Sequence, residues 1–319
     1  MNRRDFIVTS MAGMAGLGVG PAVASEERKP GRRFTLCLAC GMIGVSADPR
    51  QLLDWASQHG FESVEPPSSF LAGASDAALG EYRAAMAARK IVWGAAGLPV
   101  DFRGADAAFD GGMKSLPHLA RSLERAGVTR VATWLTPGHK TLTYLANFRL
   151  HVKRLREVSR VLGDHGIRLG LEYVGPKTSW TAHRFPFIHT MAEMKDLIAD
   201  IGRDNVGFLL DSWHWHTAQE TAADLLTLRA NDVVMCHIND APANVPVAQQ
   251  VDNRRELPCA TGVIDLRAFL EALVTLGYDG PVACEPFNQE LRKLPPDQIL
   301  GTVAAAMKKA AALVHEVQD

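Results

Sequence analysis

The chain has 319 residues, 47% of them hydrophobic, and a formal net charge of −1 at pH 7. This length and apolar content suffice for one large globular domain or two small ones with a substantial core. The charge is near neutral and Lys and Arg form no long run, which argues against a nucleic acid or an anionic membrane surface as the partner.

The first 24 residues have the features of a twin-arginine export signal. Arg3 and Arg4 precede a weakly apolar, glycine-containing run over 8–20, and Ala22 and Ala24 supply a small-x-small cleavage site. An N-terminal helix of a cytosolic protein is the alternative. No segment has the ~20 apolar residues that a membrane span needs. We therefore expect a signal peptide over 1–24, a linker over 25–33 and an exported, periplasmic protein without a membrane anchor.

After residue 33, short apolar runs alternate with longer amphipathic ones. The predicted strands are 34–39, 63–65, 91–96, 130–134, 168–173, 206–211, 233–238 and 282–285. The predicted helices are 49–59, 77–88, 112–126, 145–163, 191–201, 218–228, 266–276 and 299–317. Several helices are followed by a glycine shortly before the next strand, as at Gly60, Gly127 and Gly277, which is typical of a left-handed C-cap.

Eight strand–helix repeats predict a single α/β domain over 34–319, a (β/α)₈ TIM barrel. An open, doubly wound sheet is the alternative, but it usually carries a Gly-rich phosphate loop after the first strand, and 40–44 matches such a loop weakly. One loop is long, 239–262 after the seventh strand, and loops of this length are commonly functional. We expect it to cover a substrate.

Four predicted strands end on a side chain that can bind a metal ion: Glu172, Asp211, His237 and Glu285. Taken singly, a glutamate here can be a salt-bridged rim residue and the histidine a core residue. Together they indicate a metal site, because buried charge at four neighbouring strand ends is costly unless a cation compensates it. Three carboxylates and an imidazole suit Mn²⁺, Mg²⁺, Co²⁺ or Zn²⁺.

The five cysteines do not read as a disulfide framework, because their number is odd in a chain of this size. Cys37 and Cys40 have zinc-knuckle spacing, but no second pair accompanies them. Cys236 and Cys284 each directly precede a candidate ligand, so on a strand they point away from the metal site and into the surrounding core. We interpret the cysteines as structural.

The segments around the four candidate ligands resemble the sugar phosphate isomerase/epimerase superfamily. Its members are xylose isomerase-like barrels that include ketose 3-epimerases, inosose dehydratases and hydroxypyruvate isomerases. The matching stretches are LEYVGP at 171–176, LDSWHW at 210–215, HIND at 237–240, TGVID at 261–265 and GPVACEP at 280–286. The resemblance covers essentially all of 34–319, and it implies a xylose isomerase-like TIM barrel.

The resemblance implies that Glu172, Asp211, His237 and Glu285 bind one divalent metal ion, with Mn²⁺ the expected ion. It also makes Glu172 and Glu285 an acid/base pair on opposite faces of the substrate. One glutamate removes a carbon-bound proton next to a carbonyl, and the other returns a proton to the resulting cis-enediolate.

Further residues are candidates for substrate contacts. His214, three residues after Asp211, matches the family's Asp-x-x-His element and would donate to a substrate oxygen. Arg255 stands where family members often place a substrate-contacting arginine, and Arg254 competes with it. The rim positions Trp134 and Glu65, at two further strand ends, would also contact substrate.

The family's well-studied sugar epimerases carry an arginine soon after the ligand histidine, whereas here 240–243 reads DAPA. We expect Arg255 to take that role from further along the loop. The expected function is a metal-dependent isomerase or epimerase of a sugar or keto-sugar. A lyase or dehydratase of a keto-sugar or 3-keto-glycoside is the first alternative, and a non-catalytic sugar-binding protein is the second. The partner would be a small carbohydrate, and related barrels often form homo-oligomers.

Overall fold

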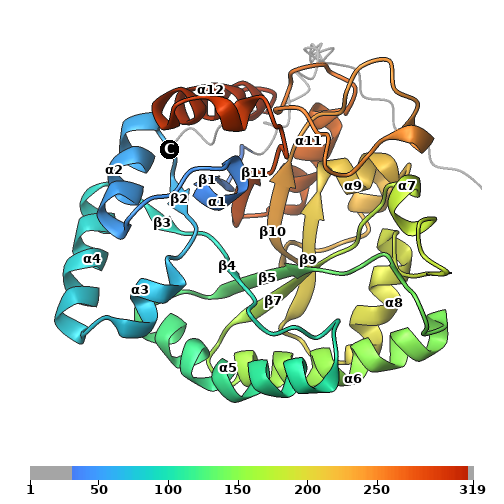
Figure 1. Cartoon of the computed structure of the whole chain (residues 1–319). Helices are drawn as coiled ribbons and strands as arrows, with labels where there is room; N and C mark the ends of the chain where they lie inside the picture. Colours follow the sequence, from blue (N-terminus) through green and yellow to red (C-terminus); the bar gives the residue numbers. More distant parts are fainter. Residues whose placement is uncertain (1–30, 315–319) are drawn as a thin grey trace, which may run out of the picture.

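The strands close into a barrel in the computed structural model, which describes residues 31–314 (Figure 1). The segments are β1 (Thr35–Leu38), β2 (Ser63–Val64), β3 (Val92–Trp93), β4 (Ala96–Gly97), β5 (Arg130–Trp134), β7 (Arg168–Glu172), β9 (Val206–Asp211), β10 (Val233–Ile238) and β11 (Pro281–Cys284). Their order in the sheet is β3-β2-β1-β11-β10-β9-β7-β5-β4, and each neighbouring pair is parallel. Because β3 and β4 are consecutive in the chain and stand at the two ends of this order, they complete the ring as one interrupted strand. The predicted (β/α)₈ barrel is confirmed.

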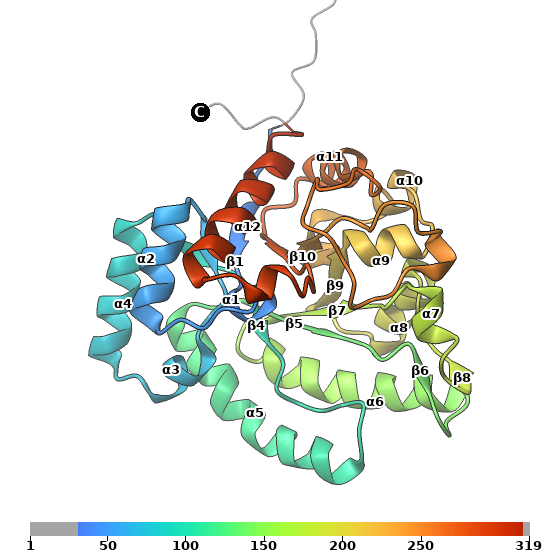
Figure 2. The same ribbon diagram turned by 45° about the horizontal axis from the view of Figure 1, so that its top comes forward.

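Helices surround the barrel (Figures 1 and 2). The long ones are α2 (Pro49–His59), α4 (Asp76–Ala88), α5 (Asp106–Ala126), α6 (Tyr144–Gly163), α8 (Met191–Ile201), α11 (Leu266–Leu276) and α12 (Pro296–Ala311). Short ones are α1 (Cys40–Ile43), α3 (Ser68–Gly73), α7 (Lys177–Trp180), α9 (Ser212–Thr217) and α10 (Ala222–Leu225). Within residues 31–314, no helix is both long and apolar enough to cross a membrane. The predicted signal peptide, 1–24, lies outside the described residues.

Four predicted elements were wrong in detail. Two differ only in extent: α5 begins at Asp106 instead of 112, and α12 covers Pro296–Ala311 instead of 299–317. The other two are interrupted. The helix expected over 218–228 is reduced to α10, and α9 precedes it. Gln219 adopts a left-handed conformation (φ 59°) between them, and Thr221 and Asp224 form a capping box that starts α10. The third strand breaks at Gly94, where a Cβ atom would lie 2.7 Å from Cys37 Sγ and 3.2 Å from the Val64 carbonyl oxygen. Only a glycine allows this close approach between neighbouring strands.

The two faces of the strands pack into different cores. The outer face, with the helices, forms the large hydrophobic core, which includes Cys236 and Cys284 as predicted. The inner face forms a small layer inside the barrel, made of Cys37, Ala39, Ala95, Ala132, Leu209, Met235 and Ala283. Because side chains alternate along a strand, the candidate ligands two residues after Leu209, Met235 and Ala283 also face inward. All five cysteines are free.

Asp240 fixes the long loop 239–262 to the end of β10. Its buried carboxylate accepts hydrogen bonds from four backbone N–H groups, those of Ala241 (2.8 Å), Thr261 (3.0 Å), Gly262 (2.7 Å) and Ile264 (3.0 Å). The backbones of Asp240 and Glu256 exchange two further hydrogen bonds of 2.9 and 2.8 Å. Burial raises the pKa of Asp240, but the four donors outweigh it and leave the pKa below its usual value.

We predict that Asp240→Asn lowers the free energy of unfolding at pH 7 by about 2 kcal/mol, because an amide cannot accept all four N–H bonds. The folded-state pKa is lowered, so the carboxylate stabilises the protein above its unfolded pKa of about 3.9 and loses this effect as the pH falls below that value. Urea unfolding at pH 7 and at about pH 3.5 should show the difference between wild type and variant shrinking at the lower pH. The control is Asp265→Asn. Asp265 caps α11 by accepting the N–H of Ala268, and an asparagine can still accept this bond. An equal loss of unfolding free energy in both variants would contradict the role of Asp240.

Candidate metal centre

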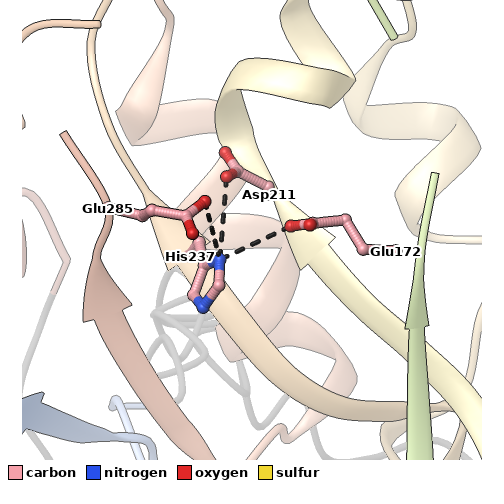
Figure 3. Close-up of side chains that lie close together, drawn as sticks. All are labelled: Glu172, Asp211, His237 and Glu285. Carbon is pink, nitrogen blue, oxygen red and sulfur yellow. Dashed lines mark ion pairs between the residues drawn. The ribbon is translucent and has the colours of Figure 1, made fainter. Parts of the chain in front are cut away.

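The four predicted ligands meet at the C-terminal end of the barrel (Figure 3). Glu172 and Asp211 are the last residues of β7 and β9, His237 lies on β10, and Glu285 directly follows β11. One ligand atom from each lies within 4.8 Å of the other three. His237 Nδ1 is 3.4 Å from Glu172 Oε1, 3.4 Å from Glu285 Oε2 and 3.8 Å from Asp211 Oδ2.

The group fits a divalent cation. Among the described residues, Glu172 Oε1 and both ring nitrogens of His237 are buried without a hydrogen-bond partner, which is costly unless a ligand binds them. The three carboxylates carry three negative charges and the adjoining Arg255 carries one positive charge, so 3 − 1 leaves two negative charges to be balanced. A hard or borderline divalent ion with oxygen and imidazole ligands meets this requirement.

The charges of His237 and the two glutamates shift one another's pKa values. Burial lowers the pKa of His237, but Glu285 and Glu172 outweigh burial and raise it well above its usual value. Burial raises the pKa of Glu172. For Glu285, burial acts in the same direction, but the charges of His237 and Arg255 outweigh it and lower the pKa to about 2. A proton on His237 thus compensates the carboxylates, and a metal ion must replace that proton to bind.

Asn239 orients two of the ligands. Its Nδ2 donates to both oxygens of Asp211 at 3.2 Å, and its Oδ1 accepts the N–H of Glu285 at 3.0 Å. The backbone N–H of Trp213 donates to Asp211 Oδ1 at 2.7 Å. The sequence placed Asn239 in a family motif without a role, although it stands two residues after His237 and so faces the same side of the chain.

Arg255 reaches the centre from the long loop and is only 2% exposed, whereas Arg254 is exposed. Its Nη1 donates to Asp211 Oδ2 at 2.7 Å and to Glu285 Oε2 at 2.9 Å, and its Nη2 donates to Asp252 Oδ1 at 2.8 Å. Of the two arginines considered from the sequence, Arg255 is the one at the site.

His214 presents a donor to the same space. The N–H of Gly175 donates to its Nδ1 at 3.2 Å, so in the neutral ring the hydrogen is on Nε2. Nε2 lies 3.3 Å from Arg255 Nη2, but that atom is also a donor and cannot accept a hydrogen bond. Asp252 Oδ1 can accept one, but at 4.0 Å it lies beyond hydrogen-bond distance. The Nε2–H group is left to a ligand.

A pocket of about 510 Å³ opens over these groups, and its wall includes Glu172, Glu285, His214, Arg255 and Trp134. Glu65 is half-buried at the end of β2 and is not among the described wall residues, and its contact with substrate stays a prediction. Burial raises its pKa, with His237 opposing. The other wall residues were not proposed from the sequence. Among them are Asp252, whose only signal was its position three residues before Arg255, and His183 and Phe287, which carried none.

We predict that Asn239→Ala weakens Mn²⁺ binding by about 10- to 100-fold, because groups that orient metal ligands usually contribute this much to affinity. Calorimetric titration of the metal-free protein measures the effect. The matched control is Asn205→Ala. Asn205 directly precedes β9, at the opposite end of that strand from Asp211, and its side chain donates two 2.9 Å hydrogen bonds to the carbonyls of Ser159 and Ile167. Equal Mn²⁺ affinities in the two variants would show that Asn239 does not support the centre.

Solved structures share this architecture. A xylose isomerase domain protein from Alicyclobacillus acidocaldarius aligns with a TM-score of 0.74 and 32% identity, covering 88% of this chain and 99% of that chain. The IolI protein, solved with a bound zinc atom, aligns with a TM-score of 0.73 and 22% identity, covering 89% of this chain and 100% of that chain. The second likeness is one of fold alone.

Curated relatives match over shorter stretches. Inosose isomerase from Bacillus velezensis is 30% identical over 148 residues, 46% of this chain and 50% of the relative. Ketose 3-epimerase from Arthrobacter globiformis is 25% identical over 161 residues (50% and 48%), and 3-dehydroshikimate dehydratase from Pseudomonas putida is 24% identical over 156 residues (48% and 23%). The chain spans half or less of the length of these relatives.

A match to a whole family covers far more of the chain. Residues 53–310 match the xylose isomerase-like TIM barrel family, and this segment contains all four candidate metal ligands together with His214 and Arg255. The match agrees with the closed ring of parallel strands and with the position of the site at their C-terminal ends. The chain therefore belongs to the xylose isomerase-like TIM barrel family.

Proposed function

We propose that this protein is an enzyme, a divalent-metal-dependent isomerase or epimerase of a sugar or keto-sugar, with Mn²⁺ as its ion. The observation that carries the proposal is the placement of Glu172 and Glu285 on opposite sides of the centre (Figure 3). Two carboxylates so placed can take a proton from one face of a substrate carbon and return one to the other face. That exchange inverts a stereocentre or moves a carbonyl group along the sugar.

The environments of the two carboxyls differ, which favours different acid/base roles for Glu172 and Glu285. Burial raises the pKa of Glu172, whereas the positive charge of Arg255, which stays when a metal ion replaces the proton of His237, lowers the pKa of Glu285. Titratable pairs whose surroundings separate their pKa values are typical of acid/base assignments. A bound divalent cation supplies a Lewis acid that makes the hydrogen next to a carbonyl more acidic.

His214 and Arg255 orient the substrate in this proposal. The Nε2–H group of His214 is free to donate to a substrate oxygen, and the guanidinium of Arg255 keeps Asp211 and Glu285 in place while it lines the pocket. Fixed donors beside the reacting carbon stabilise the negative charge that develops on oxygen as the proton leaves.

The relatives support enzymatic action on a small carbohydrate. Two of them are named as an isomerase and an epimerase, and the third as a dehydratase. The dehydratase match supports the second candidate, a lyase that uses the same proton abstraction and then expels a group from the next carbon. A non-catalytic sugar-binding protein is the remaining alternative, and it would not need the acid/base pair.

Hydrogen exchange separates these alternatives. We predict that the Mg²⁺-loaded protein in D₂O incorporates deuterium at a carbon next to the carbonyl of at least one member of a panel of ketoses and 3-keto-glycosides, as followed by NMR. An epimer or isomer among the products indicates the first function, and an unsaturated product indicates the lyase. Binding of the panel without any exchange would contradict catalysis and favour the sugar-binding protein.

We predict that Glu285→Gln reduces the exchange rate at least 100-fold, because the amide cannot accept the proton. It should also weaken metal binding, while the circular dichroism spectrum and the unfolding midpoint stay close to those of wild type. The matched control is Glu256→Gln in the long loop, whose Oε2 accepts from Asn288 Nδ2 at 3.2 Å. Full activity of the Glu285 variant would refute the assignment.

We also propose that the mature protein is exported and begins at or near Ser25. The support is the order of charged, apolar and small-residue segments within 1–24. N-terminal sequencing of protein from the periplasm should start at or near Ser25, and retention of residues 1–24 would refute cleavage there.

A further inference from the structure

The pocket has two chemically different parts. Its inner part is polar and carries Glu172, Glu285, His214, Asp252 and Arg255. The rest of its wall consists of five apolar residues and three polar ones: Trp134, Pro137, Val174, Ala182 and Phe287, with Thr136, Ser179 and His183. The volume of about 510 Å³ lies within the range of about 300–1,000 Å³ found for pockets that hold drug-sized ligands, which are larger than one sugar ring.

One side of the apolar part is built from two loops that brace each other. This outer wall consists of Trp134 at the end of β5, Pro137 from the loop that follows, and Ala182 and His183 from the loop after α7. The loops are joined by the antiparallel pair β6 (Gly138–His139) and β8 (Phe185–Pro186), which lie side by side at the edge of the barrel (Figure 2). The N–H of Phe187 also donates to the Pro137 carbonyl at 2.8 Å.

Gly138 lets the two loops pack closely. A Cβ atom at this position would overlap the side chain of His183, so only a glycine allows the imidazole to lie against the neighbouring loop. The outer wall therefore has a defined shape before any ligand binds, as is usual for small-molecule sites.

The indole ring of Trp134 is packed against Arg103 on one face. The guanidinium of Arg103 lies 4.4 Å from the centre of its ring, and Arg103 Nε donates to the Trp134 carbonyl at 2.8 Å. The residue is nevertheless 49% exposed, and it lines the pocket. It pairs with Glu172 in the register of β5 and β7, so the backbones of the two residues lie one strand spacing, about 5 Å, apart.

We infer that the substrate carries a second ring with a flat apolar face, which lies against Trp134 and the rest of the outer wall while the keto-sugar occupies the polar part. The site would then take glycosides in preference to free or simple alkyl sugars. This inference rests on the proposed function for the polar part. The flat face can belong to an aryl aglycone or to the C–H face of a second sugar, since both pack against an indole ring.

The test compares three probes on the Mg²⁺-loaded protein by calorimetry: methyl 3-keto-β-D-glucoside, phenyl 3-keto-β-D-glucoside and 3-ketocellobiose. We expect at least one of the two larger probes to bind about 10-fold or more tightly than the methyl glycoside. The tighter of the two identifies the source of the flat face. Equal affinities for all three probes would overturn the inference.

Variants of the wall sharpen the test. Trp134→Ala should reduce the preference for the larger probe to less than about two-fold, and Ala182→Trp, at an exposed position, should reduce it by filling the space. The matched control is Trp180→Ala, a tryptophan of α7 that stacks on His189 at 4.7 Å and is not part of the pocket wall, and it should keep the preference. An unchanged preference in both wall variants would overturn the inference.

The binding measurements test the second-ring site, and deuterium exchange tests the proposed function, so the two can be contradicted independently. Deuterium exchange without a preference for the larger probes would contradict the second-ring site and leave the proposed function intact. A preference that depends on Trp134, found without exchange on any probe, would support the second-ring site and contradict catalysis. Absence of binding of all three probes would contradict the second-ring site.

Discussion

Three carboxylates within a few Å of one another, two of them buried and Glu285 partly buried, are the feature on which the rest of this site depends. Such a cluster repels itself and has lost its hydration, so it is stable only when positive charge and hydrogen-bond donors compensate it. Arg255, His237, Asn239 and the N–H of Trp213 each contribute to that compensation. Even so, an oxygen of Glu172 and both ring nitrogens of His237 remain without a hydrogen-bond partner among the described residues, at the position where a divalent cation fits.

The barrel makes this concentration of charge possible. Its parallel strands end on one face, and the inward-facing side chains of the layer below, four of which are alanines, fill the barrel beneath the candidate ligands. Asp240 then ties the long loop to the end of β10, and the same loop delivers Arg255 between Asp211 and Glu285. The position of Arg255 at the site therefore depends on the fold of this loop, which the backbone hydrogen bonds to Asp240 hold in place.

The sequence predicted the barrel and the meeting of the four candidate ligands because both leave periodic or positional signals: alternating strands and helices, and a candidate ligand at each of four strand ends. It also predicted that Cys236 and Cys284 face away from the centre, since side chains alternate along a strand. It could not predict the break at Gly94 or the short helices α9 and α10, which depend on contacts between neighbouring strands and on local capping. His183 and Phe287 were missed because loop residues reach the pocket through tertiary packing that has no period in sequence.

Whether the four side chains hold one divalent cation is tested most directly by anomalous diffraction from crystals grown with Mn²⁺. We predict a single strong anomalous peak per chain, coordinated by Glu172, Asp211, His237 and Glu285, with Arg255 still bonded to a carboxylate of the group. A structure at saturating Mn²⁺ with no peak at this position, and with His237 still in contact with the carboxylates, would contradict the assignment.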